Sequence, residues 1–141
     1  MKILLTIIFL SLLSSPSWSE YFDDLVQRNG VYYKKFTDVP FSGKIYGFNV
    51  YLKTTSGSIK NGKLEGEWVS YWDNGQLESR GYYKNGKMEG KWITHHNRGQ
   101  LKSHGNYKNG KMVGKWNVYS GRGVPNKEKT GIFVNGVKIS D

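Results

Sequence analysis

Hydrophobic and polar residues alternate along short stretches of this chain. In the stretch 111–118, the even-numbered positions include Met112, Trp116 and Val118, whereas the odd-numbered positions are mostly polar. The stretches 63–70 and 87–94 repeat the pattern with Trp68 and Trp92. Alternation with a period of two is typical of a β-strand that packs one of its faces. No helical periodicity runs through this region, and 18 glycines would make helices costly.

Asn-Gly pairs separate these stretches and predict tight hairpin turns. This dipeptide suits a type I′ turn, in which both central residues need a positive φ. It occurs at 29–30, 61–62, 74–75, 85–86, 109–110 and 135–136. One strand is therefore expected over about 101–108, with its return over 111–119. A second hairpin is expected around the pair at 29–30, with a short helix over 21–26 as an alternative at its start.

A block of 24 residues is written three times, because Gly57, Gly81 and Gly105 open three similar copies at this interval. Each copy holds the string Lys-Asn-Gly-Lys, then a glycine (66, 90 or 114), then a tryptophan two places later. That glycine is expected to leave space for a neighbouring ring or to allow a close approach of the backbone. A fixed period of this length predicts repeats that stack to share a core. The fold class is all-β, a single-layer antiparallel β-meander of 24-residue hairpin repeats spanning about 25–138.

The predicted boundaries divide the chain into three parts. Residues 1–19 form a signal peptide, and 20–56 hold the first hairpin and a degenerate repeat. Residues 57–141 hold the tandem repeats 57–80, 81–104 and 105–130, with a partial copy at 131–141.

The first 19 residues are typical of a secretory signal. Lys2 precedes an apolar run from Ile3 to Leu13, and small residues lie before a predicted cut at Glu20. As a helix, this run would reach about 16 Å, which is short of the roughly 30 Å of a bilayer core. No cysteine follows the run, so a lipid-modified cysteine anchor is excluded. The mature chain is therefore expected to be exported, in the periplasm or outside the cell.

The chain is basic, with 21 Lys and Arg residues against 11 Asp and Glu residues and a formal net charge of +10. A basic exported protein favours acidic partners, such as anionic lipid headgroups, phosphorylated glycans or acidic proteins. The charge has a second reading, because it also keeps an open sheet from associating edge to edge. Nucleic acid is not expected as a partner, since the export signal argues against it. The chain has no cysteine, so its stability rests on stacking and hydrogen bonding.

Residues that could support catalysis or bind a metal are sparse. His95 and His96 are adjacent, so in a strand they face opposite sides and cannot share a metal ion. His96 and His104 flank the predicted turn at 97–100, and they are interpreted as surface imidazoles. The carboxylates are scattered, and no phosphate loop, nucleophile elbow or zinc-protease motif is present. We expect no enzyme activity, no catalytic residues, no metal and no cofactor.

The repeat string, followed by Gly-Gln-Leu at 75–77 and 99–101, resembles the bacterial variant of the MORN repeat (membrane occupation and recognition nexus). Residues 30–34 and 38–43 resemble a leader that often precedes such repeats in exported bacterial members. The resemblance covers about residues 25–136 and implies an elongated single-layer antiparallel sheet with a grooved aromatic face. It implies lipid binding, dimerisation or scaffolding, or, in one bacterial branch, toxin neutralisation. The chain departs from the pattern at His95, which replaces a tyrosine, and at Val124-Pro125, which replaces Gln-Leu.

Two candidate binding surfaces follow from the repeats. The first is an aromatic ladder, whose tryptophans form the core of the sheet and whose remaining exposed aromatic area is left for a partner. Its members are Trp68, Trp92, Trp116, Tyr71 and Tyr119. Tyr71, His95 and Tyr119 differ in parity from the tryptophans, and the sequence leaves their side of the sheet open. The second is a basic ridge of lysine pairs that bracket successive turns, namely Lys60, Lys63, Lys84, Lys87, Lys108 and Lys111.

The function predicted from these features is that of a non-enzymatic protein-interaction or scaffold module in the cell envelope. Its partner is another protein or a second copy of the chain. One alternative is binding of an anionic lipid or glycan surface through the basic ridge. The other is a toxin-neutralising partner protein, as in the antitoxin-labelled branch of the family.

Overall fold

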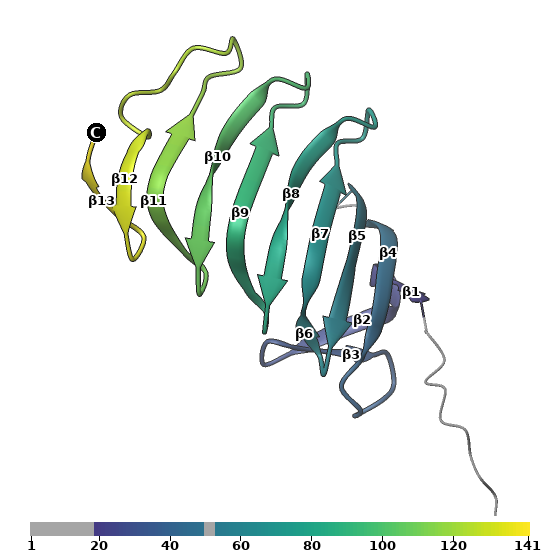
Figure 1. Ribbon diagram of the computed structural model, residues 1–141. Coiled ribbons are helices and arrows are strands. Elements are labelled where there is room, and N and C mark those ends of the chain that lie inside the picture. Colours follow the sequence, from purple (N-terminus) through teal and green to yellow (C-terminus); the bar gives the residue numbers. More distant parts are fainter. Residues whose placement is uncertain (1–18, 50–52) are drawn as a thin grey trace, which may run out of the picture.

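A single curved sheet of 11 strands makes up most of the molecule in the computed structural model, which describes residues 19–49 and 53–141 (Figure 1). The strand order is β1-β4-β5-β7-β8-β9-β10-β11-β12-β13, with β6 paired to β5 outside this path, and all neighbours in the order except β1 and β4 are antiparallel. A separate two-stranded hairpin, β2 (Leu25–Arg28) and β3 (Val31–Lys34), lies on one side of the sheet. The predicted all-β antiparallel meander is confirmed. The predicted signal peptide lies outside the described residues.

The N-terminal strands build one end of the sheet. β1 (Ser19–Tyr21) pairs with β4 in parallel, the one parallel pairing among the described strands. The expected helix at 21–26 is a single 3₁₀ turn, Phe22–Asp24, which leads directly into β2. β4 (Gly43–Asn49) pairs antiparallel with β5 (Lys53–Lys60), and the two-residue β6 (Lys63–Leu64) returns from the turn at 61–62.

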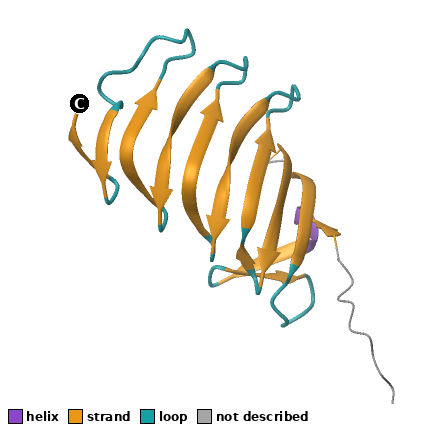
Figure 2. Cartoon of the chain, in the orientation of Figure 1, coloured by secondary structure: helices purple, strands orange, loops and turns teal. Residues whose placement is uncertain are grey.

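The repeats form the rest of the sheet, with strands joined by turns at both edges (Figure 2). The two-residue turns have a positive φ at Asn61, Asn85, Asn109 and Asn135, as the prediction required. The pair at 74–75 differs, because only Gly75 has a positive φ and the turn there is longer. The strands are β7 (Gly66–Tyr71), β8 (Leu77–Lys84), β9 (Lys87–His95), β10 (Leu101–Lys108), β11 (Lys111–Val118), β12 (Gly131–Val134) and β13 (Val137–Ser140).

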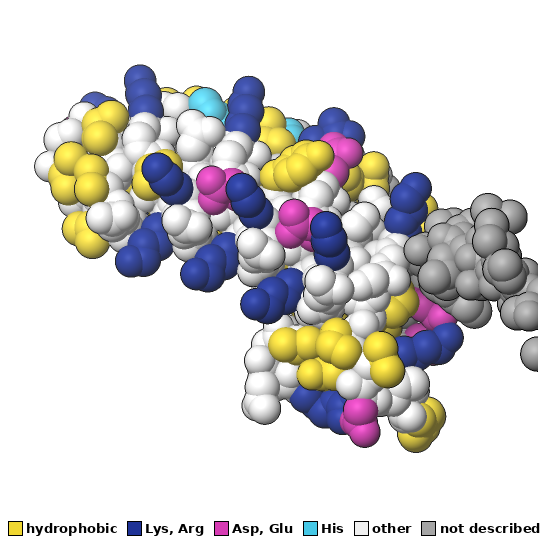
Figure 3. Space-filling view, turned by 60° about the horizontal axis from the view of Figure 1, so that its bottom comes forward, with side chains coloured by type: hydrophobic (Ala, Val, Ile, Leu, Met, Phe, Trp, Pro, Cys, Tyr) yellow, Lys and Arg dark blue, Asp and Glu magenta, His cyan; other side chains and the backbone are white. Residues whose placement is uncertain are grey.

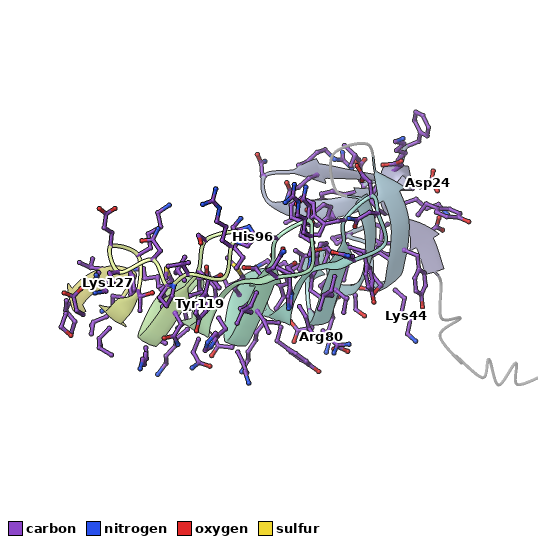
Figure 4. All side chains as sticks on the ribbon, turned by 90° about the horizontal axis from the view of Figure 1, so that it is seen from above. Asp24, Lys44, Arg80, His96, Tyr119 and Lys127 are labelled. Carbon is purple, nitrogen blue, oxygen red and sulfur yellow. The ribbon has the colours of Figure 1, made fainter. Side chains whose placement is uncertain are left out.

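The β2–β3 hairpin covers one end of the sheet and encloses the main hydrophobic cluster. Leu25, Phe41, Ile45 and Ile59 are buried there, with Trp68 packed against them. Backbone bonds hold the hairpin in place: Phe41 N donates to Tyr32 O at 2.9 Å, and Tyr32 N donates to Gly62 O at 2.8 Å. Lys44 and Arg80 point to the other side of the sheet (Figure 4). The face under the hairpin is called the aromatic face below, because it also carries the tryptophans.

Near the opposite end of the sheet, residues 120–130 connect β11 to β12, and Lys138 on β13 contacts this segment. The turn after Tyr119 keeps the hydrogen bonds of its counterparts although Val124-Pro125 replaces Gln-Leu, and a short turn over 126–130 then absorbs the extra residues. Lys138 Nζ donates to Lys127 O and Glu128 O, both at 3.1 Å, and its aliphatic stem lies over Gly131. The regular sheet therefore extends past residue 120, which the departures in sequence had left open.

Candidate functional site

A column of aromatic rings runs along the aromatic face from repeat to repeat. Its members alternate between tryptophan and tyrosine, in the order Trp68, Tyr83, Trp92, Tyr107 and Trp116. Neighbouring centroids lie 5.6, 5.3, 6.1 and 4.9 Å apart, and every pair is edge to face. This geometry brings the positive edge of one ring to the negative face of the next. The column therefore links three repeats into one packed row.

Glycines that open the repeats make room for the tryptophans. A Cβ on Gly81 would lie 2.2 Å from the Trp92 ring, and one on Gly105 would lie 2.3 Å from the Trp116 ring. The expectation for the glycine two places before each tryptophan was wrong. Gly90 and Gly114 have positive φ values of 68° and 65° with nothing near their Cβ positions. They allow a bulge in the returning strand, which a side chain would strain.

The tryptophans are core residues of the sheet. Trp92 and Trp116 are only 5% and 4% exposed. Their Nε1 groups donate to the backbone oxygens of Tyr82 at 3.2 Å and Asn106 at 3.0 Å. Trp68 packs against the cluster under the hairpin. The tryptophan ladder predicted from the sequence exists, but these rings hold the repeats together and offer little area to a partner.

The tyrosines of the predicted ladder separate from the tryptophans. The Tyr119 ring stacks on His104, at 6.3 Å between centroids and 18° between planes, and His104 pairs across the strand with Ile93. Trp92 pairs across that strand with Gly105, so Tyr119 lies on the opposite face. Tyr71 pairs with Leu77 just past the bulge between β7 and β8. The tyrosines in the column are Tyr83 and Tyr107, which sequence reasoning missed although each follows a repeat-opening glycine by two places.

Burial of the column changes the acidity of its phenols. Desolvation raises the pKa of Tyr83, Tyr107 and Tyr32 above that of an exposed tyrosine. For Tyr83, the neighbouring Tyr32 and Tyr107 phenols add a smaller increase. The hydroxyls are therefore neutral over the whole physiological pH range.

The six predicted ridge lysines lie along one edge of the sheet, at the two-residue turns (Figure 3). The pairs Lys60–Lys63, Lys84–Lys87 and Lys108–Lys111 are direct cross-strand partners, and all six side chains are exposed. Glu65 and Glu89 lie among them and accept hydrogen bonds from Asn85 N and Asn109 N, both at 2.8 Å. The edge is therefore a row of lysines, and the Glu65 and Glu89 carboxylates among them are hydrogen-bonded to the backbone of the turns.

The histidines take structural positions rather than a shared site. His96 occupies the place of Trp72 one repeat earlier: Trp72 Nε1 donates to His95 O at 3.2 Å, and His96 Nε2 lies 3.0 Å from Tyr119 O. Because a carbonyl only accepts, His96 Nε2 carries the proton.

No three His, Asp or Glu side chains come together as metal ligands within residues 19–49 and 53–141. Nor does any helix of the described residues have the length and hydrophobicity to cross a bilayer.

β13 lies at the C-terminal end of the strand order, where it pairs only with β12 and leaves its other edge free. Val134, Val137 and Ile139 are 51%, 65% and 61% exposed there. Figure 3 shows hydrophobic side chains gathered at this end of the molecule. An open strand edge beside exposed aliphatic side chains is a template for pairing with another strand.

Two segments, residues 64–85 and 88–109, match the family model of the MORN repeat variant. These two tandem segments are similar to MORN repeats, and together they cover less than a third of the chain. Each matched segment starts just after one Asn-Gly turn and ends at the asparagine of the next, so a MORN repeat here is a pair of strands joined by the longer turn. MORN repeats are in general non-enzymatic modules that bind proteins or membrane lipids. No curated protein matches the chain.

Proposed function

We propose that this protein is an exported, non-enzymatic MORN-repeat module that docks a protein partner in the cell envelope through its free edge, β13. The observation that carries this proposal is the exposure of Val134, Val137 and Ile139 beside an unpaired strand edge. The tryptophans do not serve this role, because their rings are buried in the sheet. A partner strand that adds to β13 gains backbone hydrogen bonds and covers the aliphatic side chains.

The charge of the chain favours an acidic partner over a second copy. Without the predicted signal peptide, which contains Lys2, each copy has 20 Lys and Arg residues against 11 Asp and Glu residues, a formal net charge of +9, so two copies repel one another. An extended segment that carries Asp or Glu is attracted to the same surface. A toxin neutralised by the module would be one such partner, and self-association is the competing outcome.

The proposal of export rests on the apolar N-terminal run, and N-terminal sequencing after cell fractionation tests it. A mature chain beginning at Glu20 supports export, and an intact Met1 in the cytoplasm contradicts it.

A photo-crosslinking amino acid at Ile139, used in intact cells, tests the docking site. We expect a crosslink to one protein with an acidic extended segment, and its loss when Val137→Glu places a negative charge at the edge, because that charge repels the acidic segment. Val124→Glu is the matched control, because Val124 is 59% exposed on the turn at 120–124, outside β12 and β13, and it should leave the crosslink intact. A crosslink only to a second copy replaces the acidic partner by self-assembly. Equal loss in both variants, or no crosslink, rejects docking at β13.

The basic ridge supports a second candidate function, binding to an anionic membrane or glycan surface. Three exposed lysine pairs follow one another along a single edge, at steps of roughly 10 Å set by two strand spacings. Vesicles that contain anionic lipid should bind the protein at low ionic strength and release it at physiological ionic strength.

Replacing Lys84, Lys87, Lys108 and Lys111 with Glu tests this second function. We expect vesicle binding to be lost, whereas Lys91→Glu with Lys115→Glu, both exposed on strands away from the turns, should reduce it only slightly. Equal loss in both variants would show a general effect of net charge and reject the ridge.

A further inference from the structure

The edge opposite the lysines is built from three longer turns with the same backbone geometry. In each turn the first residue donates its N–H to the fifth residue's carbonyl, and the fourth donates to the first. These bonds are 2.7 and 2.8 Å in 72–76, 2.8 and 2.8 Å in 96–100, and 2.8 and 2.9 Å in 120–124. Because the turns match, Asn74, Arg98 and Arg122 take equivalent places. Two arginines therefore follow one another in neighbouring turns. The turns are separated by two strand spacings, which is about 10 Å.

A side-chain amide bridges the first two turns, and no such bridge joins the second and third among the described residues. Asn74 Nδ2 donates to Asn97 O at 2.6 Å, which bridges the space between turns 72–76 and 96–100. In the next interval Arg98 takes the place of Asn74 and makes no such bond among the described residues. Gly121 takes the place of Asn97 and adds no side chain. A hollow of 760 Å³ opens between these two turns, lined by His96, Arg98, Gln100, Ser120 and Arg122 among others.

The lining of this hollow includes hydrogen-bond donors from Arg98, Arg122 and Ser120, beside the apolar side chain of Val124. No Asp or Glu borders it, and neither arginine takes part in an ion pair among the described residues. Ser120 Oγ accepts from Val124 N at 3.2 Å and Arg122 N at 3.4 Å, so its O–H stays available as a donor. His96 lines the same hollow as the two arginines, and its Nε2 lies 3.0 Å from Tyr119 O; Figure 4 labels His96 and Tyr119.

We propose that this hollow, the turn pocket, binds a phosphomonoester group. Each guanidinium offers two parallel N–H donors that match two oxygens of a phosphate. The two guanidinium groups and the Ser120 hydroxyl together offer more hydrogen-bond donors than the two oxygens of one carboxylate can accept. The three terminal oxygens of a phosphomonoester can accept more of these hydrogen bonds. The group belongs either to a soluble ester, such as a phosphorylated sugar, or to a lipid headgroup. Neither the basic ridge nor β13 contributes to the pocket.

Calorimetric titration of the full chain with glycerol 3-phosphate tests the pocket. We expect binding that weakens at least tenfold in Arg98→Gln with Arg122→Gln. The control, Lys127→Gln with Lys129→Gln, removes the same charge from exposed residues outside the pocket and should bind as the natural chain does. Gly121→Asp should also abolish binding, because it places a carboxylate between the arginines. Circular dichroism confirms that each variant folds.

Several results would overturn the proposal: no binding of glycerol 3-phosphate by the natural chain, equal weakening in both double variants, or full binding by Gly121→Asp. Vesicles that contain phosphatidic acid, compared with vesicles of equal charge that contain phosphatidylglycerol, separate the two sources of the group. Preference for phosphatidic acid assigns the pocket to a headgroup. Binding of glycerol 3-phosphate without that preference assigns it to a soluble ester. The four ridge substitutions to Glu should leave binding of glycerol 3-phosphate unchanged.

Discussion

Single glycines decide whether the aromatic column can form. At Gly105 a side chain would meet the Trp116 ring, so Gly105→Ala must displace the ring or the strand. Overpacking of this kind costs about 1–3 kcal/mol. We expect Gly105→Ala to lower the urea midpoint clearly and to change the tryptophan fluorescence of the native state.

Gly121→Ala is the matched control for this substitution. Gly121 does not adopt a positive φ, and no atom lies within 4 Å of the position that its Cβ would take. Its replacement should leave the urea midpoint nearly unchanged. A similar loss of stability in both variants would mean that the contact with the ring is not the cause.

The buried phenols make stability depend on pH in the alkaline range. An exposed tyrosine in the unfolded chain loses its proton near pH 10, whereas burial raises the pKa of Tyr83 in the folded chain. The folded state then holds more protons than the unfolded state, so the free energy of unfolding is constant below about pH 9 and falls above about pH 10. Tyr83→Phe keeps the ring but removes this proton. Its urea midpoint should fall less between about pH 8 and pH 10.5, and an equal fall would contradict the assignment.

Between elements, the two-residue turns are tied to the preceding repeat. Glu65 and Glu89 accept the amide hydrogens of Asn85 and Asn109, but the third repeat has Val113 at this place. Val113→Glu should supply the missing acceptor for Asn135 N. One such bond contributes about 0.5–1.5 kcal/mol, so we expect a higher urea midpoint. Val124→Glu changes the charge equally on a distant turn and should not raise the midpoint.

The elements of the repeats were predictable because the sequence encodes them locally. Asn109-Gly110 requires a turn of positive φ, and the alternation on both sides of it predicts β10 and β11 almost to the residue. These features depend on neighbouring residues alone, and tertiary contacts agree with them. The side of Tyr119 stayed open in the sequence, because a bulge between Trp116 and Tyr119 would reverse their parity.

Other features depend on contacts that no local pattern encodes. At the longer turn 72–76 only Gly75 has a positive φ, and the Asn74 side chain instead donates to Asn97 O one repeat away. The burial of Trp92 follows from its fit over Gly81, and a period of two alone does not distinguish a core ring from an exposed one. The turn pocket was missed for a related reason, because Arg98 and Arg122 gain significance only when their turns are known to match.

At the scale of the whole molecule, each repeat contacts mainly its neighbours. Deletion of residues 81–104 therefore removes one complete repeat and brings Tyr107 to the place of Tyr83, between Trp68 and Trp116. We expect the shortened chain to fold into a shorter sheet with a lower urea midpoint, since stability in such arrays is approximately a sum over repeats and interfaces. Circular dichroism and the urea midpoint check this.

Deletion of residues 81–92 alone is the control. It removes half a repeat, so the strands that follow would run in the wrong direction and place Trp116 away from its glycine. This chain should not fold cooperatively. If both deletions gave the same result, the 24-residue repeat would not be the structural unit.

The short reach of the contacts between repeats has a consequence for how the chain is made. Side chains and backbone groups of neighbouring repeats bond over separations of 20 to 23 positions. A ribosome adds about 5–20 residues per second, so a repeat takes on the order of a few seconds to emerge. A hairpin closes in about 1–10 μs. Every new strand thus meets a finished neighbour, and at the growing end of the sheet only the newest strand waits for a partner.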